Sequence, residues 1–528
     1  MKNGIYTMMV LAASTLGVSA ENMYLHGIWG KGQQQLFSSP QAWTTQKGAA
    51  GRTIAAEDTL NLIDNSGNAK IDGDFTVKYL NLGGFLGQKT PDGNVTFSMD
   101  KTAAGGKDGS LTIDAAKERD KNRKGSYIAS VMSSAFAGVS ADKAQKPLKR
   151  QTLTFDGGSV KILNSKDYYG TVGIYLTARR TPKTAPDYYG GVIFNSPVKF
   201  FNDVNVYSDN LVYADTIGYQ VCKIKFLKNV EVASEKDGKE LYRKFAIQPL
   251  STNYFTPLMT VQVGDEKHPK ALMRTGDFSL DRGSSADIYG SLEINGDLKM
   301  NRAAMLNVKK GGALSITSAK TGKVAGLKTD MLARMNIDGK FTVSNPKIRG
   351  ERTEFIDCQI HVGPTGSIRV DGSGIDGRNA LYLEKSLLSL QKGATVYARN
   401  MVRLGTQARL QLFGENQISA KEPANKLCRL YLDGARAIVE AHANQHFDGF
   451  FGNKPATLRL CDGANEVRFD KMFKGKWGTQ TKIKIEGFKN GVVKIDNDDP
   501  FVKTNVVADG WKDFRIENGI LTATKAGE

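Results

Sequence analysis

Residues 287–318 alternate apolar and polar side chains, pair after pair. The apolar members all lie at even positions and are Leu292, Ile294, Leu298, Met300, Leu306, Val308, Leu314 and Ile316. A period of two is typical of half-buried β-strands and not of helices, so one face stays apolar through four short strands. Asn295-Gly296 and Gly311-Gly312 lie between the pairs, where Gly tolerates tight turns.

The repeat length of this pattern indicates how the strands stack. Leu292 and Leu314 are 22 residues apart, which is about one coil of a solenoid with three short strands per coil. We therefore predict an all-β fold: a parallel β-helix (β-solenoid) with short non-repetitive insertions and capped ends. This fold accommodates the 528 residues in one elongated body, because each coil contacts only its neighbours.

Changes in composition divide the chain into five predicted regions. Met1–Ala20 has a positive start, an apolar centre and small residues at its end, which is typical of a secretory signal peptide. We expect an N-terminal cap and the first coils in residues 21–100, the solenoid in 151–500 and strands of a C-terminal cap in 501–528. Residues 101–150 are expected to form a charged, flexible insertion, with a short helix in its small-residue part, Ser126–Val139. No stretch beyond the signal is apolar over the ~18 residues of a membrane helix, so we expect no transmembrane segment in the mature chain.

The chain carries a formal net charge of +18. One interpretation is attraction to polyanions, such as an acidic polysaccharide or another polymer of the cell envelope; the other is a solvated surface with dispersed lysines. No dense block of Lys and Arg occurs, since the nearest, Lys117–Lys124, also contains Glu118 and Asp120. We expect no specific nucleic-acid partner.

The four cysteines allow two interpretations. Cys222, Cys358 and Cys428 share the parity of neighbouring apolar residues, which predicts thiols that point inward. Cys461 has the opposite parity to Leu458 and Leu460, so it is expected at a strand end or outside. The alternative is one disulfide, which an exported chain permits.

Two segments have the residue types of a metal site. His442 and His446 have a spacing that would place both imidazoles on one helical face, with Glu440 or Asp448 completing the site, although Gly449 favours a loop instead. Asp371 and Asp376 lie in a Gly-rich segment whose oxygen atoms suit Ca²⁺, and the alternative is a simple Asp/Gly turn. Apart from Ca²⁺, we expect no cofactor.

The strand pairs with Asn-Gly, Gly-Gly and Asp-Gly turns, behind a signal peptide, resemble the passenger regions of bacterial autotransporter-type β-helix surface proteins. The closing segment GWKDFRIENGILTAT, residues 510–524, is similar to the final strands of such proteins. Neither a translocating outer-membrane barrel nor a hydrophobic sorting tail is expected after the repeats. The resemblance implies an exported protein of the cell surface, extracellular space or periplasm.

The sequence favours a non-catalytic role over an enzyme. β-Helix folds also host polysaccharide lyases and glycoside hydrolases, which need paired carboxylates or a base with a charge-stabilising partner. Outward residues of the regular coils are mostly Lys, Arg, Ser, Thr and Asn, and no Gly-His-Gly element occurs. We therefore predict no catalytic residues and a structural or adhesion-type surface protein that binds anionic glycans, with a β-helix lyase or hydrolase as the alternative.

Overall fold

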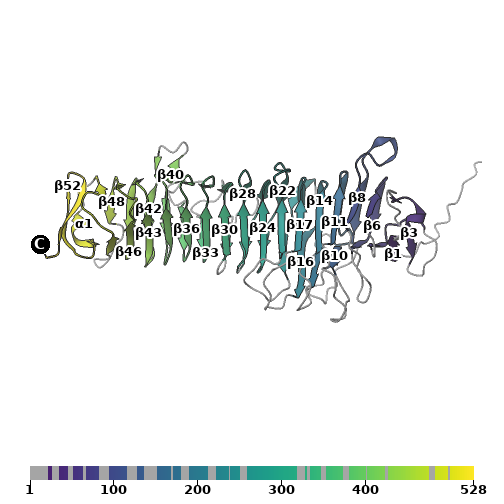
Figure 1. Cartoon of the computed structure of the whole chain (residues 1–528), viewed down its shortest axis with the longest axis horizontal. Helices are drawn as coiled ribbons and strands as arrows, with labels where there is room; N and C mark the ends of the chain where they lie inside the picture. The colour runs from purple at the N-terminus through teal and green to yellow at the C-terminus, as the bar shows by residue number, and fades with distance from the viewer. Residues whose placement is uncertain are drawn as a thin grey trace, which may run out of the picture.

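The computed structural model is a rod of stacked coils whose strands run across the long axis, with the first strands, β1 and β3, at one end of the rod and β52 and the C-terminus at the other (Figure 1). The coils contribute strands to three walls, and the strands within a wall pair in parallel apart from a few antiparallel additions. The structure describes residues 22–25, 35–45, 52–62, 67–82, 94–115, 128–135, 151–167, 170–179, 190–211, 222–236, 238–249, 259–301, 303–317, 327–329, 333–345, 353–372, 380–399, 401–421, 426–452, 454–474, 482–496 and 500–527. The predicted signal peptide, Met1–Ala20, lies outside these residues.

The first wall consists of two consecutive sheets. The N-terminal sheet contains the parallel strands β1 (Asn22–Leu25), β4 (Thr59–Leu62), β7 (Tyr79–Leu82), β10 (Ile128–Ala135), β13 (Thr171–Arg179), β16 (Asp203–Leu211), β20 (Phe245–Pro249), β23 (Phe278–Leu280), β26 (Leu298–Met300) and β29 (Leu327–Thr329), with β3 (Trp43–Thr45) antiparallel to β1. The second sheet begins where β29 meets β32 and contains β32 (Thr353–Ile356), β35 (Ala380–Glu384), β38 (Met401–Leu404), β42 (Arg429–Leu432), β45 (Gly449–Gly452) and β48 (Met472–Lys474).

The second wall is one ladder that runs nearly the whole length of the rod. Its strands are β2 (Gln35–Leu36), β5 (Gly67–Lys70), β8 (Asn94–Ser98), β11 (Gln151–Asp156), β14 (Gly190–Asn195), β17 (Cys222–Phe226), β21 (Met259–Val263), β24 (Ser284–Ile288), β27 (Met305–Val308), β30 (Ala333–Ile337), β33 (Cys358–Val362), β36 (Leu387–Leu390), β39 (Arg409–Leu412), β43 (Ala437–Ala441), β46 (Ala456–Leu460), β49 (Ile483–Glu486) and β51 (Val506–Val507).

The third wall also has two sheets. The first contains β6 (Asp74–Val77), β9 (Ser110–Asp114), β12 (Ser159–Leu163), β15 (Val198–Phe200), β18 (Val230–Lys236), β22 (Leu272–Thr275), β25 (Ser291–Ile294), β28 (Ala313–Thr317), β31 (Lys340–Asn345), β34 (Ser367–Gly372), β37 (Thr395–Ala398) and β40 (Ile418–Lys421), with β19 (Lys239–Tyr242) and β41 (Lys426–Leu427) as antiparallel additions. The second contains β44 (Gln445–Phe447), β47 (Val467–Phe469), β50 (Val493–Ile495), β53 (Ile520–Lys525) and β52 (Trp511–Glu517).

These pairings confirm the predicted fold. Leu292 pairs in register with Leu314, so the 22-residue step is one coil. The alternating apolar residues of each strand point inward and form one continuous core, as the burial pattern of β25 to β28 illustrates. Burying one aliphatic side chain contributes about 1.5–3 kcal/mol, and stacking repeats this gain on every coil.

Aromatic rings form part of this core on the second wall. Phe155, Phe194 and Phe226 occupy the same register on β11, β14 and β17. Their ring centroids are 4.9 and 5.2 Å apart, and the ring planes are within 13° of parallel. Parallel pairing places identical side chains directly above one another, which is why the three rings stack.

Glycines form a column at the corner between the second and third walls. Gly290, Gly312, Gly339 and Gly366 lie on successive coils, and the residue after each of the four donates a backbone hydrogen bond to the preceding coil. A Cβ atom at any of the four would lie within 2.0–2.3 Å of a backbone oxygen of the preceding coil. The close approach of backbones at this corner therefore requires Gly.

Both ends of the rod are closed by aromatic side chains. At the N-terminal end, the indole of Trp43 meets Phe37 edge-on at 5.0 Å and donates a hydrogen bond from Nε1 to the carbonyl of Phe37. At the C-terminal end, Phe488 contacts Trp511 and Phe514 of the β52–β53 hairpin at 5.1 and 5.3 Å. The helix α1 (Pro500–Asn505) precedes this hairpin, which lies where cap strands were expected. Two short 3-10 turns, Pro40–Ala42 and Ala104–Gly106, complete the described elements.

The predicted helix in Ser126–Val139 is wrong. Ile128–Ala135 forms strand β10, which pairs in parallel with β7 and β13. Within residues 101–150, β9 also belongs to a wall, so these two strands are parts of coils and not of a separate insertion. A register shift between Ala129 and Val131 breaks the alternation of β10, which is why its sequence lacks a strand pattern.

The cysteines occupy the positions that their parity predicts. Cys222, Cys358 and Cys428 are buried, whereas Cys461 follows the last residue of β46 and is partly exposed. Burial raises the pKa of Cys428 to about 12, so its thiol stays protonated. In the structure all four side chains are thiols. Among the described residues, no helix is long and apolar enough to cross a membrane.

Candidate functional site: a cationic groove on the third wall

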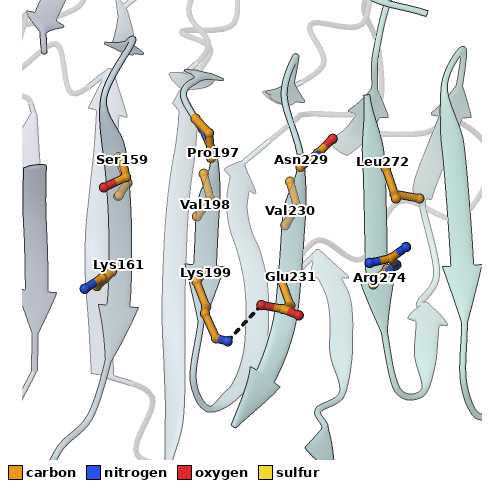
Figure 2. Close-up of a pocket in the computed structure, with 11 residues that line it drawn as sticks. Ser159, Lys161, Pro197, Val198, Lys199, Asn229, Val230, Glu231, Leu272 and Arg274 are labelled. Atoms are coloured by element: carbon orange, nitrogen blue, oxygen red, sulfur yellow. Dashed lines mark ion pairs between the residues drawn. The ribbon is translucent and has the colours of Figure 1, made fainter. Parts of the chain in front are cut away.

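A pocket of about 290 Å³ lies on the outer surface of the third wall. Its floor is a row of charged side chains from four successive coils, which Figure 2 shows, and we call it the cationic groove: Lys161, Lys199, Glu231 and Arg274. The other edge consists of side chains near the starts of the same strands, namely Ser159, Pro197, Asn229 and Leu272.

Strand alternation brings these charges together. On β12, Val160 and Ile162 point into the core and Lys161 points out. Lys161 pairs in register with Lys199, Lys199 with Glu231, and Glu231 with Arg274. Since neighbouring parallel strands are about 4.8 Å apart, the row is about 14 Å long. The groove thus presents charges at regular intervals along the rod axis.

The charges of the groove do not balance. Lys199 Nζ lies 2.8 Å from Glu231 Oε2, and Arg274 Nε donates to Glu293 Oε2 of the next coil at 2.9 Å. Lys161 is exposed and forms no ion pair with any residue that the structure describes. Because Lys161 lies one coil from Lys199, the N-terminal half of the groove carries the excess positive charge.

A hairpin adds a second carboxyl group beside the groove. β19 folds back on β18 and pairs antiparallel with it, and the side chain of Glu240 hydrogen-bonds to that of Glu231. This hydrogen bond lowers the pKa of Glu231 and raises the pKa of Glu240, so Glu240 is the carboxyl of the pair that takes up a proton first as the pH falls. Burial, followed by the hydrogen bond to Glu240, raises the pKa of Tyr242 to about 12. The phenol therefore stays protonated near neutral pH.

This geometry suits binding better than catalysis of hydrolysis. Carboxyl groups that flank a glycosidic bond are about 5–5.5 Å apart in retaining enzymes and about 6.5–9.5 Å apart in inverting ones. Glu231 and Glu240 contact each other directly, so no sugar bond fits between them. Glu231 is also held as an anion by Lys199. Lys199 and Arg274 each have a carboxylate partner, so the unpaired charge available to a ligand is that of Lys161.

The histidine pair of the sequence lies elsewhere and is not helical. His442 is in the turn after β43, and His446 is in β44. His446 Nε2 lies 2.5 Å from Asp470 Oδ1, whereas the ring of His442 stacks on Phe413 at 4.2 Å. The expectation that both imidazoles share one helical face is therefore wrong, because a corner of the coil separates them. No group of three or more His, Cys, Asp or Glu side chains in the described part of the chain is arranged to hold a metal.

Glu440, the expected third ligand near His442, belongs to an outward ion-pair row on the second wall. Its carboxylate accepts hydrogen bonds from Arg409, Gln411 and Arg459, with donor distances of 3.0, 2.8 and 2.5 Å. Arg459 also pairs with Glu486 at 2.8 Å. Burial alone would raise the pKa of Glu440, but the hydrogen bonds from Gln411 and Arg409 outweigh burial and lower it. We call these five residues the Glu440 cluster.

The candidate calcium segment is only partly described. Asp371 ends the outward row of β34 and forms an ion pair with Arg369 of the same strand. Asp376 lies outside the described residues. The carboxylate of Asp371 is thus engaged by a guanidinium.

None of the groove residues was predicted from the sequence. The strands that carry them are separated by loops of unequal length, so no fixed spacing marks them. The available signal was a charged residue between two apolar residues near the start of each strand, which occurs in β12, β15 and β18. No family model, curated protein or solved structure matches the chain.

Proposed function

We propose that this chain is an exported, non-catalytic β-solenoid surface protein with a structural or adhesion-type role, and that its cationic groove binds acidic polysaccharides. The observation that carries the proposal is the in-register row of Lys161, Lys199 and Arg274 beside a pocket on one wall. A linear polyanion that runs along the rod axis meets a basic side chain on three of four successive coils, and the fourth carries Glu231. The sequence of Met1–Ala20 and the net charge of +18 are consistent with export and with an anionic partner.

The proposed ligand is a chain of uronic-acid or sulfated sugars. Its carboxylate or sulfate groups would pair with Lys161 and Lys199, and its hydroxyl groups would reach Ser159 and Asn229 at the other edge of the pocket. The binding free energy is expected to be modest and sensitive to salt, because the groove is open to solvent. A long rod compensates for a weak site when several copies act together on one surface.

The test is binding of polygalacturonate and of heparin to the purified full chain at low salt. We expect Lys161→Ala with Lys199→Ala to weaken binding about tenfold, and the affinity of the wild type to fall as salt rises. The matched control is Lys299→Ala with Lys340→Ala, which removes the same charge from outward positions outside the groove. Equal losses in both double variants, or binding that ignores salt, would contradict a groove-specific site.

The alternative is a polysaccharide lyase or glycoside hydrolase of the β-helix type. The same mixtures distinguish it, because a lyase forms unsaturated ends and a hydrolase forms new reducing ends. We expect neither product after prolonged incubation. Appearance of either product, abolished by Glu231→Gln, would establish catalysis in the groove and refute the non-catalytic part of the proposal.

A further inference from the structure

The first wall carries a different outward row near the C-terminal end of the rod. Tyr382, Arg403, Tyr431 and Phe451 lie in register on β35, β38, β42 and β45, and we call them the aromatic stripe. Each of the four side chains is partly exposed. The residues before and after them in these strands, such as Leu430 and Leu432, point into the core.

The members of the stripe pack on one another. The guanidinium of Arg403 lies 4.9 Å from the ring centroid of Tyr431 and 6.0 Å from that of Tyr382. The rings of Tyr431 and Phe451 are 6.1 Å apart at an angle of 26°. Because this distance exceeds the coil spacing of about 4.8 Å, the rings are offset rather than eclipsed. Because each ring is partly exposed, some aromatic surface of the stripe reaches solvent.

The charges next to the stripe are already balanced. Arg403 pairs with Asp433, and Arg429, which lies over Phe451 at 5.9 Å, pairs with Asp448 at 2.5 Å. The hydroxyl of Tyr382 donates to Glu384 at 2.7 Å. The stripe thus combines aromatic surface with planar hydrogen-bonding groups that carry no excess positive charge, in contrast to the cationic groove.

This combination distinguishes between the ligands that fit an aromatic surface. A polyanion would meet guanidinium groups that Asp433 and Asp448 already occupy, and the stripe has no counterpart of the unpaired Lys161 of the groove. The core of a contact between two copies of the chain would be depleted in Asp and Glu, whereas three carboxylates border this stripe. Sugar rings of a neutral polymer have C–H faces that pack on the aromatic side chains and hydroxyl groups that hydrogen-bond to the guanidinium and carboxylate groups.

We propose that the aromatic stripe is a second glycan-binding site, specific for an uncharged linear polysaccharide that runs along the rod axis. The site goes beyond the role proposed for the cationic groove, because it lies on another wall and takes a ligand of different charge. Successive sugars would contact successive coils, with Tyr431 and Phe451 as the main apolar contacts. Arg403 and Arg429 would donate to hydroxyl groups through the N–H groups that their ion pairs leave available.

The experiment is co-sedimentation of the full chain with amorphous cellulose, chitin and starch. We expect wild type to bind at least one of these polymers at high salt, and Tyr431→Ala with Phe451→Ala to weaken that binding about tenfold or more. The matched control is Tyr397→Ala, which removes an outward aromatic ring of the third wall that also lies against an arginine, Arg369. The groove variant Lys161→Ala with Lys199→Ala should bind the neutral polymer as the wild type does.

A second measurement does not depend on a folded variant. Saturating the wild type with the bound polymer should slow amide hydrogen exchange in 429–432 and 449–452 and leave 395–398 unchanged. Three results would overturn the proposal: no retention on any of the three polymers, equal binding by wild type and the double variant, or a double variant that changes a dimer into a monomer. Because polygalacturonate binding is assayed separately, failure of the stripe and failure of the groove give different results.

Discussion

The cationic groove and the Glu440 cluster are two rows of outward charged side chains with different chemistry. Each row spans successive coils in register, and each alternates acids with bases over part of its length. In the Glu440 cluster the central carboxylate is only 2% exposed, and three donors converge on it. In the groove the central carboxylate of Glu231 is 31% exposed and has one basic partner within its row, Lys199.

This difference in burial and in the number of partners determines whether a row of charged side chains on a solenoid stabilises the fold or binds a ligand. Where hydrogen-bond donors surround a carboxylate, no unpaired charge is left for a ligand to bind, and the row stabilises the stacked coils. Where a cation is left over, as at Lys161, the row attracts anions. The presence of charged residues in a strand does not decide between these roles. The number of partners that each charge has, and how deeply it is buried, decides.

The largest expected effect is a difference in stability between variants of the two rows. We expect Glu440→Ala to lower the free energy of unfolding by about 2 kcal/mol, because Arg409, Gln411 and Arg459 lose their shared acceptor. Glu231→Ala should change it by less than about 1 kcal/mol, since its ion pair is solvated. Urea-induced unfolding of both variants under identical conditions measures the difference.

Equal destabilisation by the two variants would contradict the distinction between the rows. Glu440→Gln serves as the control for Glu440→Ala, because it keeps the shape and an acceptor oxygen while it removes the charge. We expect it to be intermediate between wild type and Glu440→Ala.

The contrast between the rows also marks the limit of prediction from the sequence. The fold was predictable, because a period of two acts within each strand and a turn glycine such as Gly312 marks the corner where successive coils approach closely. Leu292 and Leu314 reveal the coil length because the connection between them has no insertion. The buried cysteines followed from the same parity argument.

The groove was not predictable, because it depends on register between coils of unequal length. Lys161 and Lys199 are neighbours only because parallel pairing aligns β12 with β15 across a long excursion of the chain. Strand β10 was missed for a related reason, since its register shift removes the alternation that marks a strand. His442 and His446 have a helical spacing that a coil corner also produces, so spacing alone could not separate the two.

An intermediate effect concerns the affinity of the groove. We expect Glu231→Ala to bind polygalacturonate about threefold more tightly than wild type at low salt, because it removes a negative charge between Lys199 and Arg274. Glu440→Ala should leave this affinity unchanged, since the Glu440 cluster lies on the second wall. Isothermal titration calorimetry of the two variants and the wild type compares them, and weaker binding by Glu231→Ala would show that Glu231 itself contacts the ligand.

The smallest effect concerns pH and the hairpin beside the groove. The pKa of Glu240 is raised in the folded chain, so its contribution to stability is present below the unfolded value of about 4.3 and is lost as the pH rises through the raised pKa. The pKa of Glu231 is lowered, and its contribution has the opposite sign, being lost as the pH falls through the lowered pKa. At a pH between the two pKa values the pair holds one proton, which forms the hydrogen bond between Glu240 of the hairpin and Glu231 of the coil. Above them two carboxylates repel, and β19 should loosen from β18.

Hydrogen exchange of the amides of β19, corrected for intrinsic rates, should therefore show greater opening as the pH rises through the raised pKa of Glu240. Glu240→Gln supplies a neutral donor at every pH, so it should abolish this dependence while the exchange of distant strands such as β43 stays as in wild type. A loosening that persists unchanged in Glu240→Gln would mean that another group holds the hairpin. Because Glu240 of the hairpin lies against Glu231 of the groove, that result would mean that the hairpin opens beside the groove without the proton shared by Glu231 and Glu240.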